Sequence, residues 1–341
     1  MALTAPQVLH KLLDRADLAR NEMLDVMHQI MRGEYTPAQI AGVLVALRMK
    51  GETVDEIAAA AEVMRSLSTK VQVADDEHLV DTCGTGGDGI QTFNVSTVSA
   101  IVAAAAGAKV AKHGGRSVSS TCGSADVLEA LGVNVSLTPE QVARCVNEIG
   151  IGFMFAPNHH SAMRHAAPVR RELGVRTLFN LLGPLTNPAG ANNQVMGVFD
   201  RALTGKLAHV LQQLGSRHVL VVHGADGMDE ISFSGDTYVA ELKGSRVSEY
   251  LLNPRQFGMN LHQAESIRVQ NAEESKAMML AVLEGQSGPA RDIVVLNAGA
   301  AIYVAGLAAN LQEGIAKAGL VIGDGSAMMK LRQLIALSTT S

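Results

Sequence analysis

The chain has 341 residues, 47% hydrophobic and 18% charged, which is long enough for two domains with separate cores. Its 28 basic and 33 acidic residues leave a net charge of −5, so no general basic field indicates a nucleic-acid partner. Three cysteines without a C-x-x-C pair argue against a disulfide scaffold and indicate the reducing cytoplasm.

The first seventy residues predict helices only. Charged residues occur throughout the N-terminal stretch of this region, so we expect neither a signal peptide nor a membrane segment. Thr36, followed by proline and by Gln39, is typical of a helix start, and Gly51 is typical of its end. Thr53 starts a second helix that reaches about Leu67. Residues 1–70 therefore form a predicted helical domain.

From residue 71 onward, short apolar runs alternate with helical stretches. This alternation predicts a larger α/β domain over 71–341, with a central, mainly parallel sheet flanked by helices. The polar, proline-containing stretch near 160–190 interrupts the alternation of strands and helices. We expect part of it to belong to the helical domain. The expected strands are 78–81, 109–113, 152–156, 194–199, 218–223 and 292–297.

A glycine-rich loop follows the first expected strand, over residues 81–89. Its glycines let main-chain N–H groups approach an anion, and the helix that follows adds a partial positive charge. Gly84, Gly86 and Gly89 match G-x-G-x-x-G, a weak dinucleotide motif. No acidic residue stands between Asp88 and Asp126, where a dinucleotide site needs one, and no Walker motif is present.

A basic loop, residues 112–120, follows the second expected strand. It contains Lys112, Arg116 and several hydroxyl side chains, which suit phosphate oxygens. Both loops open at the carboxyl ends of neighbouring strands, where α/β proteins bind ligands. The alternative is that each loop is only a tight turn of the sheet. The sequence predicts a phosphate site here.

An acidic loop follows the strand expected at 218–223 and contains Asp229 and Glu230. Adjacent carboxylates on such a loop can hold Mg²⁺, which shares its remaining positions with water and substrate phosphates. A solvated acidic turn is the alternative. No zinc-ligand spacing and no G-x-S-x-G nucleophile motif occurs in the chain.

Six segments spread over nearly the whole chain resemble the anthranilate phosphoribosyltransferase family. The resemblance implies a small helical domain, a larger α/β domain, a hinge between them and a homodimer formed through the helical domain. It implies the substrates anthranilate and 5-phosphoribosyl 1-pyrophosphate (PRPP), with two Mg²⁺ ions as cofactor, and a place in tryptophan biosynthesis. The segments are GTGGDG at 84–89, TFNVST at 92–97, KHGGRSVSS at 112–120, GSAD at 123–126, APVRRELGVRTLFNLLGPLTNPA at 167–189 and HGADGMDEIS at 223–232.

The resemblance also implies roles for individual residues. Ser96, Asp229 and Glu230 would hold magnesium, and Arg170 would bind the anthranilate carboxylate. The remaining implied substrate-binding residues are Gly84, Gly87, Asp88, Thr92, Asn94, Val95, Ser96, Thr97, Lys112, His113, Gly114, Gly115, Arg116, Ser117, Val118, Ser119, Ser120 and Ser124. Gly115 departs from the family, which often has asparagine at this position, where its amide can contact anthranilate.

Displacement of pyrophosphate from ribose C1 passes through a cationic state and needs no strong general base. Lys112 and Arg116 are candidates for neutralising the leaving group, and His113 is either a proton acceptor or, as we favour, a packing residue. Two other enzymes remain as alternatives: a phosphoribosyltransferase for another aromatic acceptor, and a pyrimidine-nucleoside phosphorylase. A non-catalytic nucleotide-binding regulator is the alternative from another class.

Overall fold

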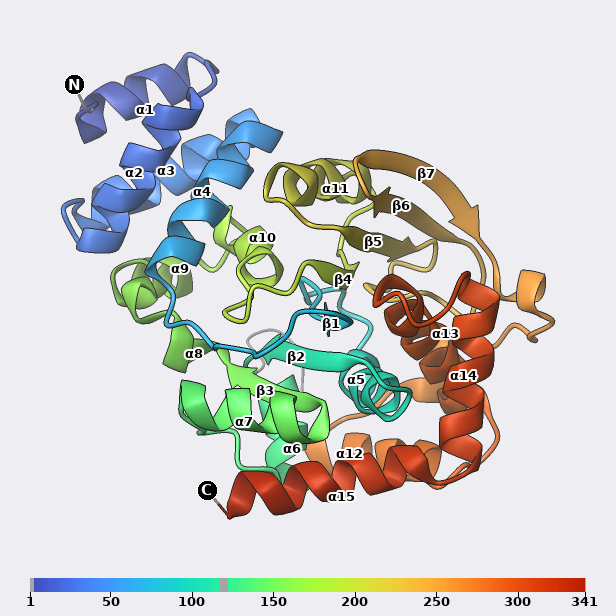
Figure 1. Ribbon diagram of the computed structural model, residues 1–341. Helices are drawn as coiled ribbons and strands as arrows, with labels where there is room; N and C mark the ends of the chain where they lie inside the picture. The colour runs from blue at the N-terminus through green and yellow to red at the C-terminus, as the bar shows by residue number, and fades with distance from the viewer. Residues whose placement is uncertain (1–2, 117–121, 341) are drawn as a thin grey trace. The chain divides into compact units, whose positions relative to one another are not determined.

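The computed structural model describes residues 3–116 and 122–340, and the chain divides into two compact units. The first unit comprises Met1–Thr69 and His159–Pro188, and the second comprises Lys70–Asn158 and Ala189–Ser341. The first unit is helical, and the second is built around a seven-stranded sheet (Figure 1). This architecture confirms the predicted fold class. No helix in the described part of the chain is long and apolar enough to cross a membrane.

The helical unit begins with four helices whose ends follow the capping signals. Thr36 Oγ1 accepts a hydrogen bond from the Gln39 N–H, and Gly51 ends that helix with φ +86°. Thr53 Oγ1 accepts from the Glu56 N–H in the same way. The predicted helix starts are confirmed. The four helices are α1 (Ala5–Leu13), α2 (Arg20–Arg32), α3 (Pro37–Lys50) and α4 (Val54–Leu67).

The later part of the helical unit packs against these four helices. It contains α9 (Ala167–Leu173), which contacts α3, and α10 (Phe179–Leu182), which contacts α4. The Arg65 Nε–H donates to the Leu185 carbonyl at 2.7 Å, and the Thr69 N–H donates to the His159 carbonyl at 2.9 Å. Two chain segments distant in sequence therefore form one unit.

The sheet of the second unit has the order β3-β2-β1-β4-β5-β6-β7, and its first five strands in that order are parallel. The chain leaves β1 toward β2 on one side, and β4 pairs with β1 on the other side. The carboxyl ends of β1 and β4 therefore flank a topological switch point, where open α/β sheets bind ligands. The strands are β1 (Leu79–Asp81), β2 (Lys109–Gly114), β3 (Ile151–Phe155), β4 (Asn193–Gly197), β5 (His218–Gly224), β6 (Thr237–Lys243) and β7 (Arg246–Leu252).

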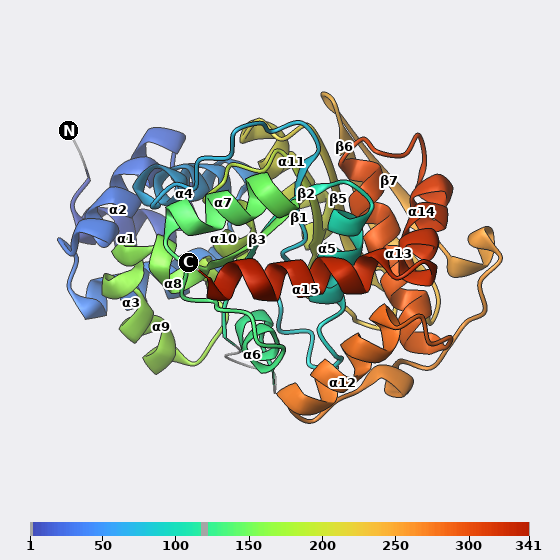
Figure 2. The same cartoon turned by 60° about the horizontal axis from the view of Figure 1, so that its bottom comes forward.

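Helices cover both faces of this sheet. Alanine-rich α5 packs with the C-terminal helices against Val110, Val195 and Leu220 in one core, whereas Ala111 and Met154 face a second core with α7. Figures 1 and 2 show α13 and α14 side by side. These helices are α5 (Val95–Ala105), α6 (Ser124–Ala130), α7 (Pro139–Ile149), α11 (Leu203–Gln213), α12 (Ala272–Leu283), α13 (Pro289–Val304), α14 (Leu311–Gly323) and α15 (Ser326–Thr339). Short helical turns complete the chain: α8 (Ala156–His159), η1 (Ser161–His165), η2 (Gly183–Leu185), η3 (Pro254–Phe257) and η4 (Ala264–Ile267).

Two features of the sheet differ from the sequence prediction. The strand predicted over 292–297 is wrong, because these residues lie inside helix α13. Pro289 in the first turn and the small residues that follow 297 support a helix, and Gly299 allows α14 to approach closely. The antiparallel hairpin β6–β7 was not predicted. The other five predicted strands are present, each within two residues of its expected ends.

Candidate active site

Three loops meet at the carboxyl edge of the parallel strands. The structure bounds them as the glycine loop, residues 82–94 after β1 (predicted at 81–89), the basic loop, residues 115–123 after β2 (predicted at 112–120, so that Lys112 belongs to β2), and the acidic loop, residues 225–236 after β5. Residues 117–121 of the basic loop lie outside the described residues, and with them the predicted site residues Ser117, Val118, Ser119 and Ser120. In the described part of the chain, the predicted phosphate and magnesium residues thus lie at or after the carboxyl ends of β1, β2 and β5.

The glycine loop and the acidic loop are joined by main-chain hydrogen bonds to carboxylates. The Gly86 N–H donates to Asp229 Oδ2 at 2.8 Å, and the Asp229 N–H reaches Asp88 Oδ2 at 3.5 Å. Gly86 has φ +66°, a conformation that glycine adopts without strain. Two residues separated by more than 140 positions are therefore held in contact at the switch point.

Glu230 lies against the start of helix α5. Its Oε1 accepts a hydrogen bond from the Ser96 N–H at 3.0 Å, in the first turn of that helix, where free N–H groups favour anions. Lys112, which is only 3% exposed, donates from Nζ to the Thr82 carbonyl at 3.0 Å and to Ser96 Oγ at 3.3 Å. Lys112, Ser96 and Glu230 therefore form one polar cluster.

The acidic side chains carry unfavourable negative charge. Burial raises the pKa of Asp229 above its ordinary value, and the neighbouring Asp88 carboxylate raises it further. Burial also raises the pKa of Glu230, with a further rise from Asp229 that Lys112 partly offsets. A divalent cation beside these oxygens would stabilise both ionised carboxylates. The donor set fits Mg²⁺, which prefers carboxylate oxygens.

Within residues 3–116 and 122–340, no three His, Cys, Asp or Glu side chains converge to enclose a metal ion. Two adjacent carboxylates are nevertheless enough for Mg²⁺ in phosphate-transferring sites, because water and the substrate phosphates complete its coordination. The two carboxylates are therefore compatible with a Mg²⁺ ion whose other ligands are water and substrate.

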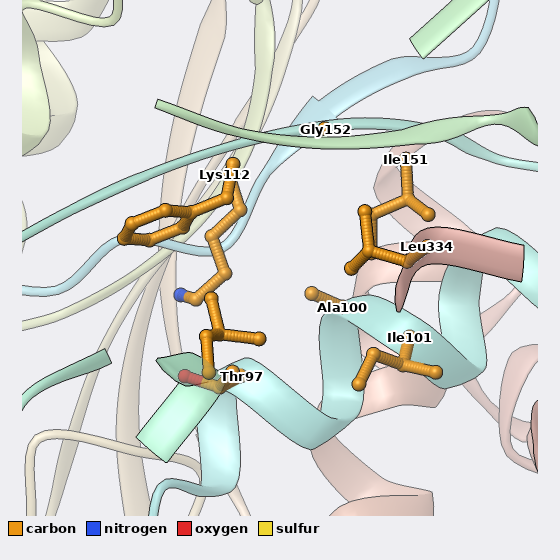
Figure 3. Close-up of a pocket in the computed structure, with 9 residues that line it drawn as sticks. Thr97, Ala100, Ile101, Lys112, Ile151, Gly152 and Leu334 are labelled. Atoms are coloured by element: carbon orange, nitrogen blue, oxygen red, sulfur yellow. The ribbon is translucent and has the colours of Figure 1, made fainter. Parts of the chain in front are cut away.

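Lys112 also borders a small internal cavity of about 10 Å³ between β2, β3 and α5. Figure 3 shows its side chain extending from the strand toward Thr97, with Ala100 and Ile101 on the far side of the space. A space of this size and apolar lining holds no substrate. The cavity is a packing gap next to Lys112 of the polar cluster.

Asn94 connects the glycine loop to the end of the basic loop. Its Oδ1 accepts from Ser275 Oγ at 2.6 Å, and its Nδ2 donates to the Cys122 carbonyl at 3.2 Å. Ser275, fully buried on α12, also accepts from the Asn94 N–H at 3.1 Å. Asn94 is thus positioned by a residue that sequence reasoning did not single out.

Other predicted site residues have defined surroundings. Arg116 forms ion pairs with Asp126 and Glu129 on α6, and its side chain is half exposed. His113 is buried, which supports a packing role, and its main-chain N–H donates to Asp81 Oδ1 at 3.2 Å. Thr92 forms an isolated bridge with residue 268.

Several further predicted residues lie at the start of α5 or in the loops. Val95 and Thr97 are buried, and their main-chain N–H groups donate to the Phe93 carbonyl at 2.7 Å and to the Asn94 carbonyl at 3.1 Å. Ser124 begins α6, and its side chain lies beside Gly114. Gly84, Gly87 and Asp88 lie in the glycine loop, and Gly115 begins the basic loop.

Arg170 belongs to the first unit, on helix α9. Its guanidinium lies 5.4 Å from the centre of the Phe179 ring, and burial lowers its pKa. Among the described residues its Nε has no hydrogen-bond partner. A partly buried guanidinium with an unpaired Nε donor is suited to a carboxylate.

The sequence did not reveal the residues outside the loops that form hydrogen bonds to them. Ser275 and Asn297 each bond to a loop residue, yet neither belongs to a recognisable motif. Ser275 and Asn297 act on residues at least 66 positions away, so no local sequence spacing could reveal them.

Two family models match the chain. The helical bundle domain of the glycosyl transferase family matches residues 6–68, and the a/b domain of the same family matches residues 76–328. The two matches cover most of the chain. They define its class as a glycosyl transferase with a helical bundle and an α/β domain.

Individual relatives narrow this class. The chain is 68% identical over 338 residues to anthranilate phosphoribosyltransferase of Methylobacillus flagellatus, covering 99% of both chains. It is 44% identical to the crystal structure of anthranilate phosphoribosyltransferase from Thermus thermophilus, with a TM-score of 0.92, covering 97% of this chain and 99% of that one. The Saccharomyces cerevisiae enzyme in complex with PRPP and Mg is 28% identical, with a TM-score of 0.90, and the match covers 99% of this chain and 98% of that chain. The chain belongs to the anthranilate phosphoribosyltransferase family, which confirms the predicted family.

Proposed function

We propose that this chain transfers the 5-phosphoribosyl group of PRPP to the amine of anthranilate, releasing pyrophosphate, in tryptophan biosynthesis. The observation that carries the proposal is the Asp229–Glu230 pair, held against the glycine loop and the start of α5 at the switch point. Phosphoribosyl transfer from PRPP needs a site where a cation and main-chain N–H groups stabilise the departing pyrophosphate.

Two Mg²⁺ ions would bind at this site, as the family resemblance implies. They would be held by Asp229, Glu230 and Ser96. When bound, Mg²⁺ neutralises pyrophosphate oxygens as charge develops on the leaving group. The raised pKa values of Asp229 and Glu230 support this role, because two buried carboxylates without a cation are unfavourable. Lys112 supplies a further fixed positive charge beside Ser96.

PRPP would bind along the glycine and basic loops. Main-chain N–H groups of the glycine loop would donate to phosphate oxygens, and Lys112 would stabilise negative charge nearby. Arg116 reaches phosphate only if it exchanges its present ion pairs with Asp126 and Glu129. The proposed PRPP-binding residues are Gly84, Gly87, Asp88, Thr92, Asn94, Val95, Ser96, Thr97, Lys112, His113, Gly114, Gly115, Arg116, Ser117, Val118, Ser119, Ser120 and Ser124.

Arg170 would bind the anthranilate carboxylate and so orient the aromatic amine. Its partly dehydrated guanidinium and unpaired Nε support this role. Positioning is the main demand on the enzyme, because the amine attacks a ribose carbon that becomes cationic as pyrophosphate leaves. No general base is assigned.

The helical unit would form the contact of a homodimer in the cytoplasm. Leu13 at the end of α1 and Met49 near the end of α3 are each 71% exposed, and Val45 on α3 is 40% exposed. Large apolar side chains exposed on neighbouring helices are typical of an interface with a second copy. We propose 1–70, with part of 160–190, as the helical domain and 71–341 as the PRPP-binding domain.

The test is anthranilate fluorescence followed over time with purified protein, PRPP and Mg²⁺, each omitted in turn. The chain has no tryptophan, so protein background is low. We expect a decay that requires all components. No decay with anthranilate, together with turnover of another aromatic acceptor, would support the second candidate function, which Gly115 favours because it lacks the amide frequent in the family.

A further inference from the structure

Asn297 forms a two-point contact with the main chain of the acidic loop. Its Oδ1 accepts from the Ile231 N–H at 2.9 Å, and its Nδ2 donates to the Ile231 carbonyl at 3.0 Å. The same Nδ2 donates to the Ile293 carbonyl at 3.0 Å, one turn back in α13. Asn297 is 2% exposed, so these contacts form away from solvent. The amide therefore pairs with residue 231 as a neighbouring strand would.

This pairing defines the orientation of the amide. A flipped side chain would place the Nδ2 donors against the Ile231 N–H and the Oδ1 acceptor against two carbonyl groups. No aliphatic residue can satisfy both groups, and their loss would leave a buried N–H and C=O without partners. Few side chains can therefore replace asparagine here.

Ile231 follows Glu230 directly, and its own side chain is fully buried in the core of the second unit. The main chain at residue 231 is consequently fixed from both sides, by the core and by Asn297. Glu230 must then extend from a fixed point toward the Ser96 N–H, which it reaches at 3.0 Å. The direction of its carboxylate depends on this anchor.

We propose that Asn297 is a positioning residue of the metal site, which acts through Ile231 to hold Glu230 in its binding orientation. The inference rests on the proposed role of Asp229 and Glu230 in holding Mg²⁺. Residues that orient metal ligands typically contribute about 10–100-fold to metal affinity. Asn297 touches neither substrate nor metal, so its loss affects the metal site without removing a ligand.

The test compares Mn²⁺ binding to the purified full chain, followed by the electron paramagnetic resonance signal of free Mn²⁺. We expect Asn297→Ala to raise the Mn²⁺ Kd about tenfold or more. The same variant should need about tenfold more Mg²⁺ for half-maximal transfer activity, and excess Mg²⁺ should restore its rate. Asn297→Asp keeps the shape and an acceptor for the Ile231 N–H but loses the Nδ2 donors, so we expect a smaller shift in the same direction. If Asn297→Ala does not fold, the Mn²⁺ affinity of Asn297→Asp is used for the test.

Asn193→Ala is the matched control. Asn193 is also buried, and its Nδ2 donates to the Leu79 carbonyl at 2.9 Å. It lies at the amino end of β4, however, whereas the metal site lies at the carboxyl ends of the parallel strands. We expect it to lower the melting temperature while leaving Mn²⁺ affinity unchanged. An equal loss of Mn²⁺ affinity in this control would attribute the effect to general destabilisation and overturn the inference.

The Glu230→Gln variant separates the positioning role of Asn297 from the metal-binding role of Glu230. If Glu230→Gln weakens Mn²⁺ binding while both Asn297 variants bind like the native chain, the positioning role is wrong and the metal site stands. If Glu230→Gln binds Mn²⁺ like the native chain, the proposed metal role itself is wrong. Weaker binding in Glu230→Gln and in the Asn297 variants that fold supports both.

Discussion

Gly197 and Asp229 lie so close that a β-carbon at residue 197 would stand 1.5 Å from the Asp229 carbonyl oxygen. No real side chain tolerates that distance, so only glycine at the end of β4 allows the acidic loop to approach. The Gly197 carbonyl also accepts a hydrogen bond from the Thr85 N–H at 2.9 Å. The end of β4 is thus the surface on which the glycine and acidic loops meet.

Gly197→Ala should therefore damage both the fold and the metal site. Either strand β4 or the main chain of Asp229 must move, and we expect the free energy of unfolding to fall by about 3 kcal/mol, as in overpacked cores. Urea unfolding with and without Mg²⁺ measures this loss. Gly235→Ala is the control, because a β-carbon there meets no atom of the described part of the chain within 4 Å. Equal stability of the two variants would contradict the close approach.

The double variant Asp229→Asn, Glu230→Gln tests the metal assignment. It removes both negative charges but keeps the size of the side chains, so we expect kcat/KM for Mg²⁺-dependent transfer to fall by about 1000-fold. The metal-free protein should melt no lower than the native chain, because the substitution also removes unfavourable buried charge. Full activity of this variant would eliminate the assignment.

The same carboxylates predict a pH dependence of stability in the absence of Mg²⁺. Their pKa values are raised in the folded chain, so the folded state retains protons that the unfolded state releases. The stabilisation is complete below about pH 4, where carboxyl groups titrate in unfolded chains. It is lost as the pH rises toward about 8, where Glu230 titrates in the folded chain.

Thermal melts in EDTA between about pH 5 and pH 8 measure this loss, with the Asp229→Asn, Glu230→Gln variant as reference. The reference is needed because burial lowers the pKa of His159, which acts in the opposite direction. The native chain should lose stability with rising pH relative to the variant, and Mg²⁺ should reduce the difference. Parallel curves would show that these carboxylates do not carry the effect.

Much of the fold follows from local signals in the sequence. Thr36 and Thr53 each accept a hydrogen bond from the N–H three residues later, so the helix starts that they predict are confirmed. Such caps depend only on neighbours in the chain. The run 292–297 has the composition of a strand, but its environment between α5 and α14 makes it a buried helix. Burial on all sides removes the periodicity that distinguishes the two structures.

The site was predictable to a similar extent. The motifs located the glycine, basic and acidic loops, and the parallel topology accounts for their convergence at one edge. The contacts between them were not predictable, because Gly86 meets Asp229 and Ser96 meets Glu230 only after the sheet has formed. Gly197 shows the same limit: its need for glycine is evident only from the position of Asp229.

Gly115→Asn should strengthen anthranilate binding. A β-carbon at residue 115 meets no atom of residues 3–116 or 122–340 within 4 Å, so these residues leave room for the amide that the family often carries there. One added hydrogen bond of about 1 kcal/mol would lower the anthranilate KM about fivefold. Steady-state kinetics measures this, with Gly115→Ala as the control that fills the space without an amide. An unchanged KM in both variants would indicate that residue 115 does not contact the acceptor.

Arg170→Ala should weaken anthranilate binding far more than PRPP binding. A charged hydrogen-bonded contact to a carboxylate contributes about 1.5–3 kcal/mol, so we expect the anthranilate KM to rise at least about tenfold and the PRPP KM to change by less than about twofold. Arg171→Ala is the matched control, because its side chain is the exposed neighbour on the same helix. Arg170→Lys should give an intermediate anthranilate KM, since lysine keeps the charge but not the planar fork. Equal increases in the two KM values for Arg170→Ala would remove its assigned role, and an equal effect of Arg171→Ala would reduce it to the general charge of α9.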